Sequence, residues 1–251
     1  MLRVQAVSKS FGAVEVIRDL SLEAPTGRIT GIIGPNGAGK TTLINIIGGL
    51  LRPSAGQVLL GDHDVTPLPP HMRARLGLVR TFQISRELGE LTVLENLLLA
   101  RQHQTGESVI KAFTHRGTVK REERAAAAQA QQLLEKVGLW RLADERARAL
   151  SGGQKKLLEL SRALMLDPKL ILLDEPAAGV SPPMRSEIAQ VIRGLCGEGL
   201  TFVVVEHDMD MVASLCHRVY VIAEGRNLTS GTFKEVVADQ RVLHAYLGGI
   251  T

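Results

Sequence analysis

A loop that binds phosphate groups is predicted by the run Gly34-Pro35-Asn36-Gly37-Ala38-Gly39-Lys40-Thr41. Its glycines allow backbone N–H groups to turn toward an anion that a Cβ would obstruct. A short apolar stretch precedes the loop and a predicted helix at 40–48 follows it, so the positive end of the helix dipole points at the same place. Lys40 is expected to supply a fixed charge for the outer phosphates of a ligand, and Thr41 a hydroxyl for Mg²⁺. A chance glycine-rich turn is the alternative.

Two adjacent acids, Asp174 and Glu175, end an apolar stretch at Leu170–Leu173 that predicts a buried strand. Carboxylates at the carboxyl edge of a parallel sheet lie where α/β proteins bind their ligands. Beside a phosphate loop, Asp174 is expected to hold Mg²⁺ through water, and Glu175 to polarise the water that attacks a phosphate. A strand that ends in a solvated acidic pair is the alternative.

A second candidate anion site is the segment Leu150–Gln154, which precedes another predicted helix. Ser151 is a good residue for the N-cap of that helix, and Gly152 and Gly153 leave backbone amides open to an oxyanion. Taken alone, the segment is better explained as a capped helix start with a flexible lead-in.

The elements that must position these residues change in character along the chain. Residues 2–33 alternate between apolar and polar types, with turns between the runs, which predicts a small antiparallel sheet. Predicted strands at 170–174 and 201–205 alternate with helices, which predicts a parallel sheet covered on both faces. A stretch from about 87 to 165 is helical in pattern and interrupts this core.

The motifs together resemble those of the nucleotide-binding subunit of ATP-binding cassette (ABC) transporters. The Leu150–Gln154 string matches that family's signature in residue type, and the other motifs follow in the family's order. Gln83 comes after the predicted strand at 78–82, and His207 comes after the strand at 201–205. The resemblance covers essentially the whole chain.

The resemblance implies an α/β fold with a P-loop NTPase core, an N-terminal antiparallel β-subdomain and an inserted helical subdomain. The whole of 1–251 is then one ABC ATPase domain. Its nucleotide-binding core with the β-subdomain spans about 1–86 and 167–251, and the helical signature subdomain spans about 87–166.

The resemblance also implies a head-to-tail dimer that holds two ATP molecules, with Mg²⁺, at its interface. Each ATP is held by the loop of one copy and by the signature of the other, so that hydrolysis removes the ligand that joins the copies. The implied nucleotide contacts are Phe11, Val16, Gly34, Pro35, Asn36, Gly37, Ala38, Gly39, Lys40, Thr41, Thr42, Ser151, Gly152, Gly153 and Gln154. The implied catalytic residues are Glu175, His207 and Gln83, and the implied metal ligands are Thr41, Gln83 and Asp174.

Several of these residues have ordinary alternatives. Gln83 can be a polar strand cap, His207 a hydrogen-bonded loop histidine, and Phe11 a core residue rather than the aromatic that stacks on adenine. Ser181 departs from the family's pattern, which has an acid or Asn there to link the two sites of the dimer. Ser181 can still form a hydrogen bond but carries no charge, so the pattern that links the two sites in the family is incomplete here.

Shorter strings narrow the group within the family. The strings VRTFQ at 79–83, LTVLEN at 91–96, PAAG at 176–179, EHDM at 206–209 and AYLG at 245–248 look like those of the ATP-binding subunit of branched-chain amino-acid importers. Importers of related small solutes and the lipopolysaccharide-export ATPase share them, so an exporter remains open. A non-transport ABC ATPase is a further alternative. A P-loop switch or kinase is another, although the 150–154 signature has no role in a switch or a kinase.

Composition limits the partners. The 251 residues carry a formal net charge of only +4 and 8 aromatics, which gives little support to nucleic-acid binding. Two cysteines exclude a disulfide framework, and no apolar run approaches the length of a spanning helix. We therefore expect a cytoplasmic protein that lies on the membrane through transmembrane permease subunits. The other expected partners are a second copy or a sister ATPase and, indirectly, a solute-binding protein.

Overall fold

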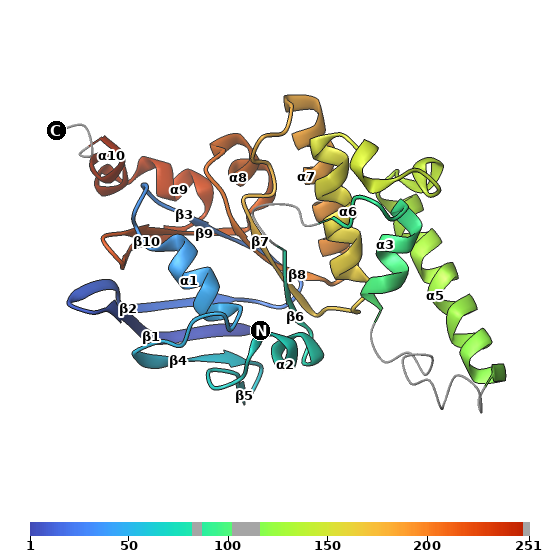
Figure 1. Ribbon diagram of the computed structural model, residues 1–251. Coiled ribbons are helices and arrows are strands. Elements are labelled where there is room, and N and C mark those ends of the chain that lie inside the picture. Colours follow the sequence, from blue (N-terminus) through green and yellow to red (C-terminus); the bar gives the residue numbers. More distant parts are fainter. Residues whose placement is uncertain (82–86, 102–115, 248–251) are drawn as a thin grey trace. The chain divides into compact units, whose positions relative to one another are not determined.

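The computed structural model describes residues 1–81, 87–101 and 116–247, and the chain separates into two compact units (Figure 1). The first unit is formed by the described parts of 1–83 together with 169–178 and 182–251. The second is formed by the described parts of 84–168 together with 179–181. The second unit is therefore inserted in the sequence of the first.

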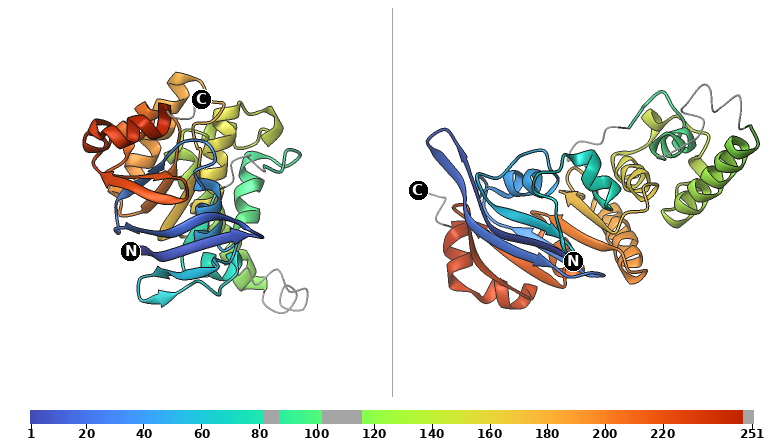
Figure 2. Two further views of the ribbon diagram at one scale, coloured as in Figure 1. Left: turned by 90° about the vertical axis from the view of Figure 1, so that its left-hand side faces the viewer. Right: turned by 90° about the horizontal axis from the view of Figure 1, so that it is seen from below.

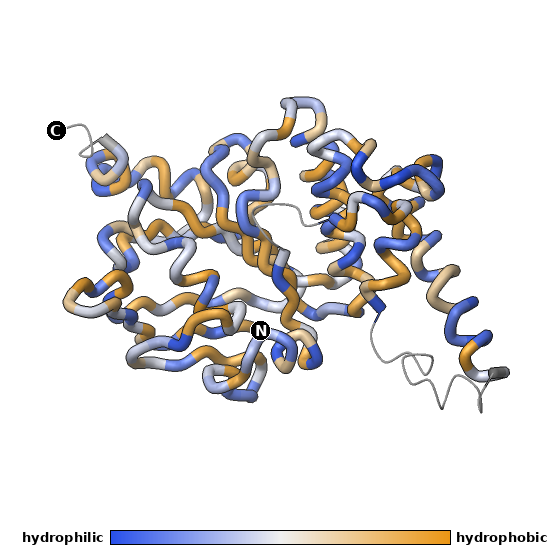
Figure 3. Tube along the Cα trace, in the orientation of Figure 1, coloured by the Kyte–Doolittle hydropathy of each residue, from blue (hydrophilic) through white to orange (hydrophobic). Residues whose placement is uncertain are grey.

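A six-stranded sheet in the strand order β10-β9-β3-β8-β7-β6 forms the centre of the first unit. Every residue of β3 (Ile29–Ile33), β7 (Leu170–Asp174) and β8 (Thr201–Val205) is buried, and Figure 3 shows these strands as largely hydrophobic. The flanking strands are β6 (Leu78–Arg80), β9 (Arg218–Ala223) and β10 (Arg226–Gly231), of which only β10 pairs antiparallel. Parallel strands covered on both faces are apolar throughout, and their carboxyl ends meet at one edge of the sheet.

The first unit also contains a four-stranded antiparallel sheet in the order β2-β1-β4-β5. Its strands are β1 (Leu2–Phe11), β2 (Val14–Ala24), β4 (Ala55–Leu60) and β5 (His63–Asp64). Inward side chains of β1 and β2 pack in one hydrophobic core with the apolar side of α1 (Lys40–Ile47). The core holds α1 between this sheet and the parallel strands.

Helix α1 is also anchored at its C-terminal end, by Arg73 of α2 (Pro70–Arg75). The buried guanidinium donates to the carbonyl oxygens of Ile46 at 2.7 Å and Ile47 at 2.6 Å. Burial lowers the pKa of Arg73 to about 10, which leaves it charged at neutral pH. A cation here satisfies carbonyls that the helix cannot bond and complements its dipole.

Four further helices belong to the first unit, namely α7 (Pro182–Gly197), α8 (Met209–Leu215), α9 (Phe233–Ala238) and α10 (Gln240–Leu247). Figure 2 shows α9 and α10 beside the red end of the sheet. Val236 of α9 and Val242 of α10 pack there against Val219 and Val221 of β9. The C-terminal segment therefore covers β9 beside the C-terminal part of β3, the strand that leads into the phosphate loop, since Val219 pairs with Gly31 and Val221 with Ile33.

The second unit is helical. It contains α3 (Val93–Ala100), α5 (Arg116–Lys136), α6 (Gly152–Leu164) and the short 3₁₀ turns η2 (Trp140–Leu142) and η3 (Ala147–Ala149). The α-helices contact one another through buried aliphatic side chains. Both α3 and α6 begin with a capping box, in which the N-cap hydroxyl and the third helical residue bond each other's backbone.

Across the described ranges of both units, the search for a bilayer-spanning helix finds none with the required length and hydrophobicity.

Candidate functional site

The glycine-rich loop leaves β3 through a backbone that requires glycine. Gly34 has a φ of 154°, and a Cβ there would lie 2.0 Å from the carbonyl oxygen of Ile222. Gly39 has a φ of 98°, and its Cβ would lie 2.6 Å from Cδ1 of Ile17 and 3.1 Å from the carbonyl oxygen of Val16. The close approach of β2 on one side and β9 on the other therefore shapes the loop. The approach of β2 also places Val16 directly against the loop at Gly39.

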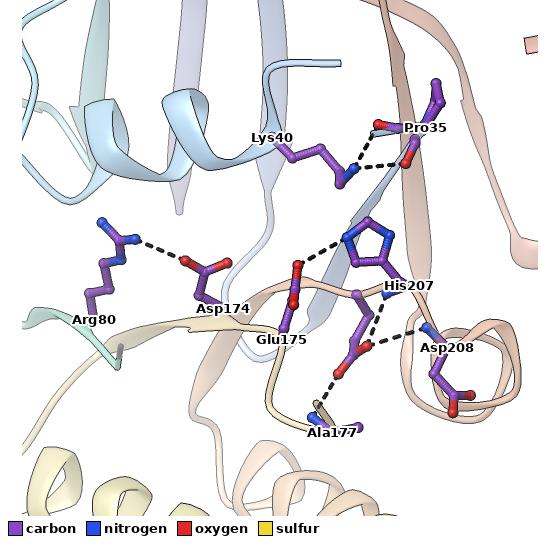
Figure 4. A network of polar contacts seen from close by, with 10 residues as sticks. Pro35, Lys40, Arg80, Asp174, Glu175, Ala177, His207 and Asp208 are labelled. Carbon is purple, nitrogen blue, oxygen red and sulfur yellow. Dashed lines mark hydrogen bonds and ion pairs between the residues drawn. The ribbon is translucent and has the colours of Figure 1, made fainter. Parts of the chain in front are cut away.

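Lys40, the first residue of α1, lies over this loop. Its side chain is buried, and its Nζ donates to the carbonyl oxygens of Gly34 at 2.7 Å and Pro35 at 2.9 Å (Figure 4). Burial lowers the pKa of Lys40, and the nearby charge of Glu175 partly opposes this effect. The ammonium group is thus held at the loop by carbonyl dipoles and a neighbouring acid.

The two acids at the end of β7 have different surroundings. Asp174 is 3% exposed and pairs with Arg80, with 2.9 Å between Oδ2 and Nη2. Glu175 has a left-handed backbone with φ of 52°, and its Oε1 lies 2.9 Å from Nε2 of His207. Adjacent carboxylates therefore face different partners, one a buried cation and the other a half-exposed imidazole.

Glu206 connects the loops that carry Glu175 and His207. Its buried carboxylate accepts from the backbone N–H of Ala177 at 2.8 Å, of His207 at 3.0 Å and of Asp208 at 3.3 Å. Burial raises the pKa of Glu206, and the three N–H donors oppose that shift. One side chain thus fixes the segment after Glu175 relative to the segment that begins at His207 (Figure 4).

The side-chain oxygens near the loop suit a Mg²⁺ ion that binds together with phosphate groups. Among the described residues no group of three or more His, Cys, Asp or Glu side chains could hold a metal ion by itself. Mg²⁺ usually binds through one or two carboxylates together with substrate phosphates and waters. A single buried carboxylate, Asp174, beside a phosphate loop that carries the Thr41 hydroxyl fits this requirement.

The remaining predicted residues lie elsewhere. Phe11 is 47% exposed, with Nζ of Lys9 5.1 Å from its ring centroid, so it is not a core residue. Ser151 belongs to the second unit and caps α6: its Oγ accepts from the N–H of Gln154 at 3.3 Å, and Oε1 of Gln154 accepts from the N–H of Ser151 at 2.9 Å. Ser181 is exposed, and Gln83 lies outside the described residues.

Thus the first unit brings together Lys40, Asp174, Glu175 and His207. Two further side chains contact this cluster, and the motifs predict no role for either of them. They are Arg80, whose partner Asp174 is far along the chain, and Glu206. Glu206 did have a signal, since it is an acid directly after the apolar strand at 201–205, as Asp174 ends the strand at 170–174.

Comparison with known families agrees with this geometry. Residues 17–178, more than half of the chain, match the family model described as "ABC transporter". The chain belongs to the ABC transporter family. Within that family it is an ATPase with the α/β fold expected from the sequence, which the matching solved structures confirm.

Two relatives show the range of named functions. "Probable branched-chain amino acid transport ATP-binding protein LivG" of Archaeoglobus fulgidus is 39% identical, over 99% of this chain and 95% of its own. "Lipopolysaccharide export system ATP-binding protein LptB" of Acidithiobacillus ferridurans is 36% identical, over 99% of this chain and 97% of its own. Both names describe an ATP-binding protein of a transport or export system.

Two solved structures show the fold in nucleotide-bound forms. The ADP conformation of an ATP-binding cassette of an ABC transporter is 37% identical with a TM-score of 0.85, and the match covers 99% of this chain and 98% of that one. A dimeric post-hydrolysis cassette bound to ADP and Pi is 26% identical with a TM-score of 0.75, covering 93% and 99%.

Proposed function

We propose that the chain is the ATP-hydrolysing subunit of an importer for branched-chain amino acids or a related small solute. The observation that carries the proposal is the near-full-length similarity to a protein named for branched-chain amino-acid transport. The sequence strings at 79–83, 91–96, 176–179 and 245–248 support the same group.

In the proposed reaction, the chain's own residues bind ATP and orient a water. The residues 34–42 bind the phosphates, with Lys40 leaving the carbonyls of Gly34 and Pro35 for the outer phosphates. Glu175 accepts the proton of the attacking water, and His207, which already contacts Glu175 at 2.9 Å, holds that water and the γ-phosphate. Phe11 and Val16 contact the base.

We further propose that Asp174, Thr41 and Gln83 hold Mg²⁺, which would neutralise charge that develops on the transferred phosphoryl group. Asp174 acts through the oxygen that faces away from Arg80. Glu206 keeps the Glu175 and His207 loops in register during the reaction.

The proposed site is completed by another chain. Ser151, Gly152, Gly153 and Gln154 of a second copy, or of a sister ATPase, would bind the γ-phosphate at the start of that chain's α6. The dimeric relative bound to ADP and Pi supports this arrangement. ATP would then close the dimer, and transmembrane permease subunits would hold the pair on the cytoplasmic face of the membrane, with a solute-binding protein acting through the permease.

One second function has a specific observation behind it, namely export. The lipopolysaccharide-export relative is almost as similar as the amino-acid one, at 36% against 39% identity. Permease and solute are chosen outside this chain, so the two functions require no difference in the residues that bind ATP.

Co-purification from membranes separates these functions. The tagged full-length chain is isolated in mild detergent from the cells that produce it, its membrane partners are identified by mass spectrometry, and the complex is reconstituted in vesicles with Lys40→Ala as an inactive control. We expect a permease pair and ATP-dependent leucine uptake. A partner that moves lipid, with no amino-acid uptake, would overturn the importer in favour of export.

A further inference from the structure

We propose that Arg80 is the counter-ion of Asp174 whenever no metal is bound, and that it restricts Mg²⁺ to entering the site together with nucleotide phosphates. The inference rests on the proposed Mg²⁺ role of Asp174. Arg80 is a positioning residue here, since it acts through the carboxylate and not on the nucleotide.

The ion pair is almost fully removed from water. Nη2 of Arg80 lies 2.9 Å from Oδ2 of Asp174, and the two side chains are 11% and 3% exposed. Solvent and salt screen such a pair much less than a surface pair, so its charges interact strongly. Figure 4 shows that the other carboxylate oxygen points away from Arg80, toward the side on which Glu175 lies. Arg80 thus occupies one oxygen and leaves the second for a ligand.

The guanidinium is fixed by more than this pair. Its Nη1 donates to Oδ1 of Asn45 on α1, the helix that Lys40 begins. Gly48, at the C-terminal end of α1, leaves room for the side chain of Arg80. A Cβ at this position would lie only 3.3 Å from Cδ of Arg80. The backbone of Arg80 pairs with β7 opposite Leu172. Strand β6, helix α1 and strand β7 therefore hold the charge beside Asp174.

A fixed cation and Mg²⁺ compete for the same carboxylate. Each lowers the stabilisation that the other gains from Asp174, because like charges near one site repel. Among the described residues no group of three or more His, Cys, Asp or Glu side chains could hold the ion by itself, so the repulsion from Arg80 weighs heavily against binding of free Mg²⁺. The phosphates of a nucleotide bring the missing negative charge, and the ion is then bound despite Arg80.

The charge of Arg80 is tested by Arg80→Gln, which keeps hydrogen-bonding groups toward Asp174 and Asn45 but removes the cation. The measurement is the Mg²⁺ concentration that half-saturates the binding of a fluorescent ADP to the full chain, with ADP affinity in EDTA as reference. We expect the half-saturating Mg²⁺ to fall roughly three- to tenfold because the repulsion is lost, while ADP affinity in EDTA changes less than about twofold.

Matched variants separate charge from packing. Arg80→Lys keeps the cation and should remain close to the original Mg²⁺ requirement. Arg75→Gln removes the same charge from an exposed position at the end of α2 and should change nothing. If Arg80→Gln does not fold, Arg80→Met serves in its place, and Mg²⁺ with ADP should raise its melting temperature more than that of the unsubstituted chain.

An unchanged or increased Mg²⁺ requirement in a folded Arg80→Gln or Arg80→Met variant overturns the inference and leaves the proposed function intact. Nucleotide binding by the unsubstituted chain that does not depend on Mg²⁺ overturns the proposed metal role and, with it, this inference.

Discussion

The sequence predicts two anion sites: the phosphate-loop cluster of the first unit (Lys40, Asp174, Glu175 and His207) and the Ser151 turn of the second unit (residues 151–154). They differ in where the polar groups find their hydrogen-bond and ion-pair partners. Lys40, Asp174 and Glu175 each contact a side chain or carbonyl from another part of the first unit. The side chains of Ser151 and Gln154 bond each other's backbone within the first turn of α6. The first site is preorganised by its own unit, whereas the second presents a capped helix turn with Ser151 and Gly152 exposed. A turn of that kind suits a ligand carried by another chain.

The largest expected effect on ATP hydrolysis comes from a substitution in the phosphate-loop cluster. Glu175→Gln removes the proposed base, and hydrolysis should fall by about a hundredfold or more, while nucleotide binding through the Lys40 loop persists. Steady-state phosphate release and equilibrium nucleotide binding measure the two effects. Glu187→Gln, on an exposed position of α7, is the control and should retain full activity.

Size-exclusion chromatography of Glu175→Gln with saturating Mg-ATP extends this prediction, since the uncleaved nucleotide should trap a dimer. A variant that stays monomeric under these conditions contradicts closure by ATP.

Adding one methyl group to each site sharpens the comparison. Gly39→Ala forces a left-handed residue against Ile17 and Val16, so it should lower nucleotide affinity at least about tenfold and the free energy of unfolding by roughly 2–4 kcal/mol. At Gly152 the nearest atom to a new Cβ is 3.9 Å away, so Gly152→Ala should leave the free energy of unfolding almost unchanged. Thermal melts and nucleotide titrations compare the pair. Equal destabilisation by both would remove the contrast.

The Ser151 turn can be tested without damaging its helix. Asp caps a helix as well as Ser, so Ser151→Asp should preserve stability but place a negative charge where the second copy's phosphate is proposed to bind. Hydrolysis should then fall at least about tenfold, as a close like-charge contact requires. Thr92→Asp makes the same exchange in the capping box of α3 and is the control. Normal hydrolysis by Ser151→Asp would leave the turn with a capping role only.

A smaller effect is expected at Glu206. Gln offers one acceptor oxygen where the carboxylate offers two, so Glu206→Gln leaves a backbone N–H of Ala177, His207 or Asp208 facing a donor, at a cost of about 1–3 kcal/mol. We expect kcat to fall about tenfold with KM nearly unchanged. If Glu206 acts by positioning Glu175 and His207, adding Glu206→Gln to His207→Ala should cost little more. Full additivity of the two losses would contradict that role.

Much of the fold follows from hydrophobic patterning. The strands at 170–174 and 201–205 are confirmed with the expected bounds, because apolar runs between turn signals define them clearly. Strand β10 and helices α2, α9 and α10 are not predicted, since they are short or half polar. Tertiary packing stabilises such elements more than local propensity does.

The residues of the site divide in the same way, into those that a local sequence pattern predicts and those that depend on tertiary structure. Residues in compact motifs, such as Lys40 and Glu175, are indicated by spacing alone. The Arg80–Asp174 pair joins positions 94 residues apart and depends on β6 lying beside β7, which no local pattern specifies. The capping role of Ser151 was predicted from its residue type, but whether its turn also binds a phosphate depends on a second chain.

That dependence is tested most directly by crosslinking between copies. Chains that carry Ser151→Cys and Glu175→Gln are mixed with chains that carry Asn36→Cys and Glu175→Gln, in saturating Mg-ATP with a short bis-maleimide. Asn36 is exposed on the phosphate loop, whereas the native Cys196 is buried and the native Cys216 is partly buried. The unsubstituted chain and each variant alone serve as controls. We expect a crosslinked product of dimer mass that forms only when both variants and ATP are present. The absence of that product with ATP bound would contradict a site shared between two copies.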